Sequence, residues 1–253
     1  MLEKEELERI SKIKNLGLRN TERDYLLEVL LYIISQNMGR KLVFEGGTAL
    51  YKFYSLNRFS EDLDFTSVSK IDINKLFEKI IQRLKAVGIN GRIKELSKYQ
   101  NQKNIRLELR GPLFDGNLNN LSIISINISL KEKPIEQSEE RTLFSQYVDI
   151  PSFSVFIMPL NEMFAEKIRA VMTRDKARDV YDIWFLLNKD AKFDIGFINR
   201  KLKLYRKKFK RNEFTEKIEE KRKSWEMDLK ELILGGLPKF EIVKNEILKK
   251  LKL

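Results

Sequence analysis

Two aspartates, Asp62 and Asp64, are the side chains of this sequence best placed to do chemistry. They belong to the stretch RFSEDLDFTS (58–67), whose alternating polar and apolar positions predict a β-strand. Residues two apart on a strand point to the same face, so the two carboxylates would lie side by side. Adjacent carboxylates repel each other unless a cation neutralises them, and the chain has no histidine or cysteine that could share a metal ion. We therefore predict a site for Mg²⁺, or for Mn²⁺, that is held by carboxylate oxygens.

A run of small residues, Gly46-Gly47-Thr48, lies upstream, where a predicted short strand passes through a Gly-Gly turn into a helix. Backbone amides at a helix N-terminus suit a phosphate group. Gly47 precedes Asp62 by 15 residues, enough for one helix and a turn back to the next strand. Taken singly, Gly-Gly before a helix is an ordinary tight turn and Asp-x-Asp is an ordinary solvated strand. Together, in this order, they favour a phosphate cradle beside a metal ion, the pair that nucleotidyl transfer needs.

A second cluster of charged residues lies in EMFAEKIRAVMTRDKARDVYDIWFLL (162–187). One interpretation is structural, with an ion pair between Arg178 and Asp179 at a helix start and another between Glu166 and Lys167. The other interpretation is functional: Lys167 reaches nucleotide phosphates or stabilises a leaving pyrophosphate.

Positive charge is concentrated at the C-terminal end of the chain. The formal net charge is +12, and residues 200–253 hold 18 basic and 9 acidic residues. The densest stretch is RKLKLYRKKFKR (200–211), which is either a solvated helix face or a contact for an RNA backbone, with Tyr205 and Phe209 interleaved for packing or stacking. The bases concerned are Arg200, Lys201, Lys203, Arg206, Lys207, Lys208, Lys210 and Arg211.

The elements that must position these residues follow from the periodicity of the chain. Strands are predicted at 92–99, 104–110 and 122–130, with a turn at 101–104, and a buried helix is predicted from Thr21. Another helix, capped by Asp72, presents one apolar face, which consists of Leu76, Phe77, Ile80, Ile81 and Leu84. After Pro159 the period becomes helical.

These patterns divide the 253 residues into two predicted domains, an α/β core at 1–159 with N-terminal helices and a helical domain at 160–253. The charged N-terminus and the absence of a long apolar run predict a cytoplasmic protein with no membrane partner.

Three stretches of the sequence resemble the AbiEii/AbiGii toxin family, nucleotidyltransferases of the DNA polymerase β-like superfamily. They are GGTALYKFYSLNRFSEDLDF, RGPLFDG…IISINISLKEK (110–133) and EKIRAVMTRDKARDVYDIWFLL. The resemblance implies an α+β fold, with a nucleotidyltransferase-like mixed β-sheet core flanked by helices and followed by a helical C-terminal domain. Members act as toxins of type IV toxin–antitoxin or phage-defence systems, and some add nucleotides to the acceptor end of transfer RNA.

The resemblance also implies substrates, partners and roles for particular residues. A nucleoside triphosphate would be the substrate and an RNA, transfer RNA in particular, would be the acceptor. A cognate antitoxin would be encoded nearby without an obligate complex. Asp62 and Asp64 would bind the metal ion and Lys167 would contact the nucleotide. The remaining nucleotide-binding residues would be Gly46, Gly47, Thr48 and Ser60 at the phosphates and Asp179 and Asp182 around the nucleotide.

One position departs from the superfamily pattern. A later strand normally supplies a third carboxylate, and the matching residue in SINISL is Asn127, which cannot act as a base. Glu108 is a possible substitute, depending on the order of the strands. Three functions therefore remain open: transfer to RNA, transfer to a protein or to a small molecule such as an aminoglycoside, and binding of nucleotide or RNA without catalysis.

Overall fold

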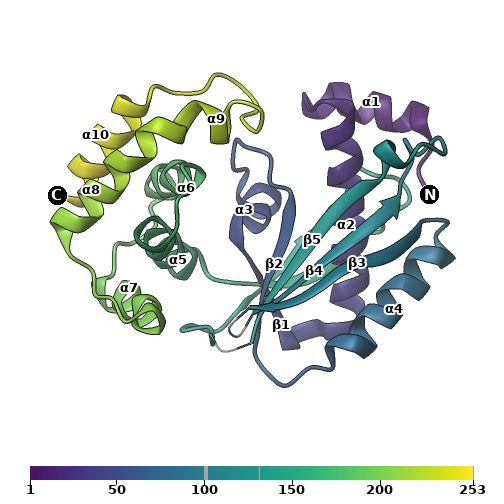
Figure 1. Cartoon of the computed structure of the whole chain (residues 1–253), viewed down its shortest axis with the longest axis horizontal. Helices are drawn as coiled ribbons and strands as arrows, with labels where there is room; N and C mark the ends of the chain where they lie inside the picture. Colours follow the sequence, from purple (N-terminus) through teal and green to yellow (C-terminus); the bar gives the residue numbers. More distant parts are fainter. Residues whose placement is uncertain (100–101, 131, 253) are drawn as a thin grey trace. The chain divides into compact units, whose positions relative to one another are not determined.

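The computed structural model describes residues 1–99, 102–130 and 132–252, and it divides into two compact units (Figure 1). The first unit consists of Met1–Ser55, Ser60–Pro134 and Ser138–Ile157, and the second of Leu56–Phe59, Ile135–Gln137 and Met158–Leu253. Two short segments thus join the C-terminal unit from earlier in the chain. The predicted domain boundary at 159 assigned them to the core, and as a statement about domains it stays a prediction.

A mixed seven-stranded sheet forms the centre of the first unit, in the order β3-β4-β5-β2-β1-β7-β6. Strand β2 pairs antiparallel with β1 and parallel with β5, and β1 pairs parallel with β7. The mixed sheet with its helices confirms the predicted fold class. The strands are β1 (Leu42–Glu45), β2 (Asp62–Ser67), β3 (Asn90–Tyr99), β4 (Gln102–Arg110), β5 (Ser122–Ser129), β6 (Glu139–Leu143) and β7 (Phe153–Ile157).

Four helices of the described residues belong to this unit. They are α1 (Lys4–Lys14), α2 (Leu18–Met38), α3 (Gly46–Tyr54) and α4 (Ile73–Ala86), together with the 3₁₀ turns Gly39–Lys41 and Leu118–Asn120. Helix α2 is apolar on nearly all sides and is deeply buried, as predicted, and it contacts α4, β5 and β7. It begins at Leu18 rather than at Thr21, because the Thr21 hydroxyl donates back to the carbonyl oxygens of Leu16 and Gly17 instead of capping the helix.

The two faces of the sheet differ in chemistry because side chains alternate along each strand. On β5, Ile124, Ile126 and Ile128 are fully buried, whereas the residues between them are half-exposed. The strands predicted at 92–99, 104–110 and 122–130 are confirmed as β3, β4 and β5. The predicted turn at 101–104 is wrong for 102–104, which lie in β4, and residue 101 lies outside the described residues.

The second unit is helical. Its helices are α5 (Leu160–Thr173), α6 (Arg178–Leu187), α7 (Ile195–Leu202), α8 (Arg211–Glu220), α9 (Trp225–Leu229) and α10 (Phe240–Leu251), with 3₁₀ turns at Lys203–Tyr205 and Lys221–Ser224. The incoming segment 56–59 lies along the loop after α9, where the Phe59 amide donates to the Leu232 carbonyl at 2.7 Å. Among the described residues, no helix combines the length and the apolar character that a membrane span requires.

Candidate active site

Strand β2 begins at Asp62 and displays Asp62 and Asp64 on one face of the sheet. Both side chains are half-buried, while Leu63 and Phe65 point to the opposite face and are buried in the core. The predicted alternation is therefore confirmed, although the strand is shorter than the stretch 58–67.

Helix α3 begins directly after β1, with no separate turn, and its first residue lies against Asp64. Gly46 has a φ of +80°, a conformation that side-chain-bearing residues rarely adopt. A Cβ added to Gly46 would lie 2.4 Å from Oδ2 of Asp64, so only glycine fits at this position. The backbone at the start of α3 thus lies so close to the Asp64 carboxylate that no side chain fits between them.

Thr48 holds α3 against β2. Its side chain is fully buried, and its hydroxyl donates to the carbonyl oxygen of Asp62 at 2.6 Å. The hydroxyl therefore stabilises the fold. The groups of the first turn of α3 that could bind a phosphate are its backbone N–H groups, which have no acceptor within the helix. Ser60 is buried two residues before β2, and Gly47 is buried at the start of α3.

Asn127 lies on β5 directly beside Asp64 in the parallel pairing of β2 and β5. Its Nδ2 donates to Oδ1 of Asp64 at 2.9 Å. The amide therefore fixes the orientation of the carboxylate but cannot take up a proton. On the next strand Asn104 pairs with Asn127, and its buried Oδ1 has no hydrogen-bond partner in the part of the chain that the structure describes.

Glu108 does not replace the missing third carboxylate. It lies on β4 opposite Ile123, four residues along the strand from Asn104, and it accepts hydrogen bonds from Lys94 and Arg92 at 2.8 Å. The hydrogen bonds from Lys94, which has the larger effect, and from Arg92 hold the pKa of Glu108 below its usual value. Within the described ranges, no group of three or more carboxylates could hold a metal ion.

The donor set that remains suits a hard divalent cation. Asp62 and Asp64 supply carboxylate oxygens on one face, and the amide of Asn127 lies next to them. Oxygen donors of this kind are those that Mg²⁺ and Mn²⁺ prefer. The close approach of Gly46 leaves no side chain between the helix start and the carboxylate, so the residues present fit such an ion.

In the second unit, Lys167 lies at the centre of a buried network. Its Nζ is 2.6 Å from Oδ2 of Asp182 and 3.2 Å from Oδ1 of Asp179. Asp179 also accepts two hydrogen bonds from Arg174, at 2.7 and 2.8 Å. The network thus joins α5 to α6, and Asp179 pairs with Arg174 rather than with its neighbour Arg178.

Arg58 completes this network, and the sequence analysis missed it. It is almost fully buried, and its Nε and a terminal nitrogen each donate to Asp182 at 2.7 Å. Burial would raise the pKa values of Asp179 and Asp182, but the cations lower both below their usual values: Lys167 and Arg174 act on Asp179, and Arg58 and Lys167 on Asp182. The sequence contained one signal for Arg58, its place at the start of the stretch 58–67. It contained none for the pair, because Asp182 lies 124 residues away.

Glu166 does not pair with Lys167. It contacts Arg169 at 2.6 Å and Lys201 at 2.7 Å, and Lys201 also contacts Glu162 at 2.7 Å. Although burial would raise the pKa of Glu166, Arg169 and Lys201 lower it to about 2. Lys201 is itself buried in this cluster, where two carboxylates offset its charge, and its assignment as an RNA contact stays a prediction.

The other bases of 200–211 lie mostly at the surface, but not on one helix face. The segment ends α7, forms the 3₁₀ turn Lys203–Tyr205 and continues as a loop to the start of α8. Lys207 is half-buried and contacts Glu213, whereas the remaining six bases are exposed. The six exposed bases are Arg200, Lys203, Arg206, Lys208, Lys210 and Arg211.

The two aromatic residues of this segment differ in environment. Phe209 is half-buried and packs against Phe193 and Phe214, with ring centroids 5.4 Å apart in both pairs. Tyr205 is exposed, and the Arg169 guanidinium lies 5.1 Å from its ring centroid. Of the two, only Tyr205 presents an aromatic face near the exposed bases.

Comparison with known proteins adds a family and a fold. A family model described as nucleotidyl transferase AbiEii toxin, of a type IV toxin–antitoxin system, matches residues 29–245. The nucleotidyltransferase toxin MenT4 from Mycobacterium tuberculosis H37Rv is 17% identical and has a TM-score of 0.69, over 99% of this chain and 88% of that one. JHP933 from Helicobacter pylori is 20% identical with a TM-score of 0.60, over 94% and 92% of the two chains. None of the curated proteins matches the sequence.

Proposed function

Because this chain belongs to the AbiEii family of nucleotidyltransferase toxins, we propose that it transfers a nucleoside monophosphate from a nucleoside triphosphate to a hydroxyl group of an RNA, with transfer RNA as the acceptor. In this reaction the hydroxyl oxygen forms a bond to the α-phosphorus while the bond to the β-phosphate oxygen breaks. Pyrophosphate leaves, and the hydroxyl proton must be taken up by a base.

The observation that supports this proposal best is the contact between the start of α3 and the Asp64 carboxylate. The N–H groups of the first helical turn favour negative charge, so they would bind phosphate oxygens beside Asp62 and Asp64. Gly46 makes this arrangement possible, because any side chain there would collide with Asp64.

Each residue of this cluster has a distinct task in the proposed reaction. Asp62 and Asp64 would hold a divalent cation, which neutralises phosphate charge when it is bound. Asn127 holds Asp64 in place through its hydrogen bond and accepts no proton. Since Asn127 takes no proton, the carboxylates are the only side chains of this cluster that could receive the proton of the attacking hydroxyl.

Lys167 would contact the nucleotide, because the buried network around it holds one more cation than it holds carboxylates. It is buried, and two carboxylates hold its Nζ, so little side-chain entropy remains to be lost on binding. Asp179 and Asp182 are fully buried behind it, and their proposed role is to orient Lys167 rather than to contact substrate.

An RNA acceptor fits the surface charge of the second unit. Six exposed bases follow one another between Arg200 and Arg211, and the exposed Tyr205 lies among them. Charges of this kind bind phosphate backbones and steer nucleic acids toward a site. A cognate antitoxin belongs to the proposal too, because the family acts within a type IV toxin–antitoxin system.

The proposal is tested by incubating the purified protein with MgCl₂, total transfer RNA and each of the four α-labelled nucleoside triphosphates in turn. Label should enter the RNA with at least one triphosphate. Asp62→Asn should lower the rate by more than about a hundredfold, because electrostatic groups at the reacting phosphate contribute on the order of 10²–10³ in rate.

The matched control is Glu61→Gln, the same carboxylate-to-amide change one residue earlier, at a side chain that contacts Arg23 of α2. It should leave transfer within about twofold of the wild type, and calorimetry should show both variants folded. Full activity in Asp62→Asn would contradict the assignment of this site. Label that enters added protein rather than RNA would keep the enzyme class but replace the acceptor.

A further inference from the structure

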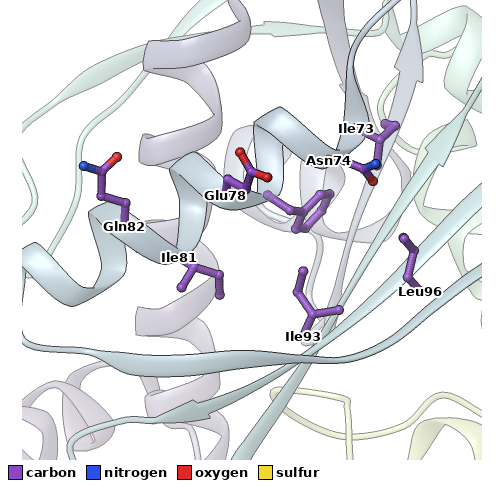
Figure 2. Close-up of a pocket in the computed structure, with 8 residues that line it drawn as sticks. Ile73, Asn74, Glu78, Ile81, Gln82, Ile93 and Leu96 are labelled. Carbon is purple, nitrogen blue, oxygen red and sulfur yellow. The ribbon is translucent and has the colours of Figure 1, made fainter.

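Helices cover one face of strands β3, β4 and β5 in the first unit. Helices α2 and α4 contact each other, and they cover this face through β5 and β3. Because Lys94 is an extra residue in a β-bulge, Ile93 and Leu96 of β3 both face α4, where they line an apolar groove (Figure 2). Ile81 of α4, which the sequence pattern places in the core with Phe77, lines the same groove and is half-exposed. The residues that alternate with these apolar ones point to the other face of the sheet.

That other face, called the outer face below, carries Asp62 and Asp64, and one row of paired residues crosses it. Asp62 of β2 pairs with Ser125 of β5. Ser125 in turn pairs with Arg106 of β4, which pairs with Glu95 of β3. Neighbouring strands lie about 4.8 Å apart, so the Cα atoms of Asp62 and Arg106 are about 10 Å apart. An arginine therefore lies in the same row as a carboxylate of the candidate site, with the short side chain of Ser125 between them.

Arg106 is held only loosely within the protein. Its side chain is 51% exposed, and in the described part of the chain the carboxylate within ion-pair distance is that of Glu95, at 3.8 Å and 53% exposed. This distance is too long for a hydrogen bond, and an exposed pair of this kind contributes little to stability. Arg92 and Lys94 differ, because each lies 2.8 Å from Glu108. Arg106 can therefore exchange its carboxylate for a phosphate at little cost.

The direction of the proposed reaction places the acceptor over this row. Helix α3 follows directly after β1, and β1 flanks β2 on the side away from β5. A triphosphate whose phosphates bind the start of α3 releases pyrophosphate on that side. The attacking and leaving oxygens lie roughly in line at the phosphorus atom, so the acceptor hydroxyl must approach from the side of β5 and β4. The RNA strand that carries this hydroxyl then crosses Ser125 and reaches Arg106.

We propose that Arg106 binds the phosphate backbone of the acceptor RNA, which lies across the outer face of β4 and β5 with its reacting end at Asp62. This inference rests on the proposed transfer reaction and specifies where its acceptor binds. The Arg106 guanidinium lies near Glu95 of β3, on the side away from Asp62, so its phosphate belongs to the RNA backbone and not to the triphosphate. The planar guanidinium suits this task, because it can donate two parallel hydrogen bonds to one phosphate.

Steady-state transfer by the full-length protein tests this proposal, with transfer RNA and the triphosphate varied separately. Arg106→Gln should raise the KM for transfer RNA about tenfold, the equivalent of one hydrogen bond to a charged group. The KM for the triphosphate and kcat should stay within about twofold of the wild type. In filter binding, the slope of log K against log salt should fall by about 0.7–0.9. The matched control is Arg83→Gln, which removes the same charge from an exposed position of α4 and should leave all four quantities unchanged.

A second variant should act in the opposite direction. Glu95→Gln removes the carboxylate that competes with the RNA phosphate for Arg106, so it should lower the KM for transfer RNA about two- to fivefold. Glu78→Gln makes the same change of charge at an exposed position of α4 and should have no effect. If Arg106 served only to hold Glu95, the loss of Glu95 would not improve RNA binding.

The outcomes separate this inference from the proposed function. Normal transfer to RNA with an unchanged KM for transfer RNA in Arg106→Gln would refute the inference alone. Equal effects of Arg106→Gln and Arg83→Gln would also refute it, because the RNA would then respond to net charge. A raised KM for the triphosphate would mean that Arg106 binds the nucleotide instead. A wild-type protein that transfers no label to RNA would overturn the proposed function, and this inference with it.

Discussion

At the scale of single residues, Asn127 is the position that departs from the third carboxylate that the sequence resemblance implies beside Asp62 and Asp64. The amide donates to Asp64, so it lowers the electrostatic cost of two neighbouring carboxylates before any cation binds. A third carboxylate in the same place would have no proton to donate and would repel Asp64. Asn127 thus stabilises the metal-free protein but gives a cation one fewer negative charge.

Replacement of Asn127 by aspartate should therefore trade stability for metal affinity. Asn127→Asp loses a hydrogen bond to a charged group and adds a like charge beside Asp64, which should lower the free energy of unfolding by about 2 kcal/mol without metal. Saturating MgCl₂ should raise the melting temperature of the variant more than that of the wild type. Calorimetry with and without MgCl₂ measures both effects.

A control on the same strand separates this effect from a general cost of new charge. Ser129→Asp adds a carboxylate to the same face of β5, opposite Thr66 rather than Asp64. It should not increase the response to MgCl₂. If Asn127→Asp gained no more from MgCl₂ than Ser129→Asp does, the metal site would not lie at Asp64.

At the scale of elements, two polar side chains of helix α3, one in its first turn and one in its second, hold it in place. Thr48 bonds to the backbone of β2, and Lys52 forms ion pairs with Asp24 and Glu28 of α2. Burial would lower the pKa of Lys52, but Asp24 and Glu28 raise it well above its usual value, so the ammonium stays charged. The helix whose start meets Asp64 is thereby fixed to two elements.

Removal of the Lys52 charge should loosen this attachment. Lys52→Met keeps most of the length of the side chain but leaves two buried carboxylates with less compensation, since Lys14 lies 2.6 Å from Asp24 but 3.7 Å from Glu28. We expect a loss of about 3–5 kcal/mol in the free energy of unfolding, measured by urea denaturation. Lys12→Met, at an exposed position of α1, should change it by less than about 0.5 kcal/mol. A small effect of Lys52→Met would mean that apolar packing alone holds α3.

Comparison of individual helices and strands with the sequence shows which parts of the fold could be predicted. Local patterns were sufficient for α4, whose Asp72 side chain accepts from the Lys75 amide as a cap, and for the apolar alternation of β5. They were insufficient for β6, because this short, charged strand has no apolar alternation and, among the described strands, it pairs with β7 alone at the sheet edge.

In the candidate site, too, the sequence could predict the local features but not the contacts between distant elements. The sequence predicted that Asp62 and Asp64 share a face, because alternation is a local property of a strand. It could not predict that Glu108 is occupied by Arg92 and Lys94, or that Arg58 binds Asp182, because these contacts depend on how distant elements pack.

At the scale of the whole molecule, the net charge of +12 is divided between bases that the fold neutralises and bases that it exposes. Lys167, Lys201 and Lys221 are buried and paired with carboxylates, so they contribute little to the outer field. The exposed bases of 203–210 have a different environment, because a 3₁₀ turn and a loop present them to solvent. Local exposure, and not total charge, should therefore determine where an RNA binds.

Reversal of charge at two places in the chain distinguishes these possibilities. Four bases between α7 and α8 are changed to glutamate in one variant, and four exposed bases of α4 in the other, so that both have the same net charge. The first set is Lys203, Arg206, Lys208 and Lys210, and the second is Lys75, Lys79, Arg83 and Lys85.

Binding of transfer RNA is measured as a function of NaCl concentration. If phosphates contact the first set, its reversal should reduce the slope of log K against log salt by up to about 3–4, since each contact contributes roughly 0.7–0.9. The α4 variant should keep the wild-type slope. Equal losses in the two variants would mean that the RNA responds to the field of the whole protein rather than to the surface after α7.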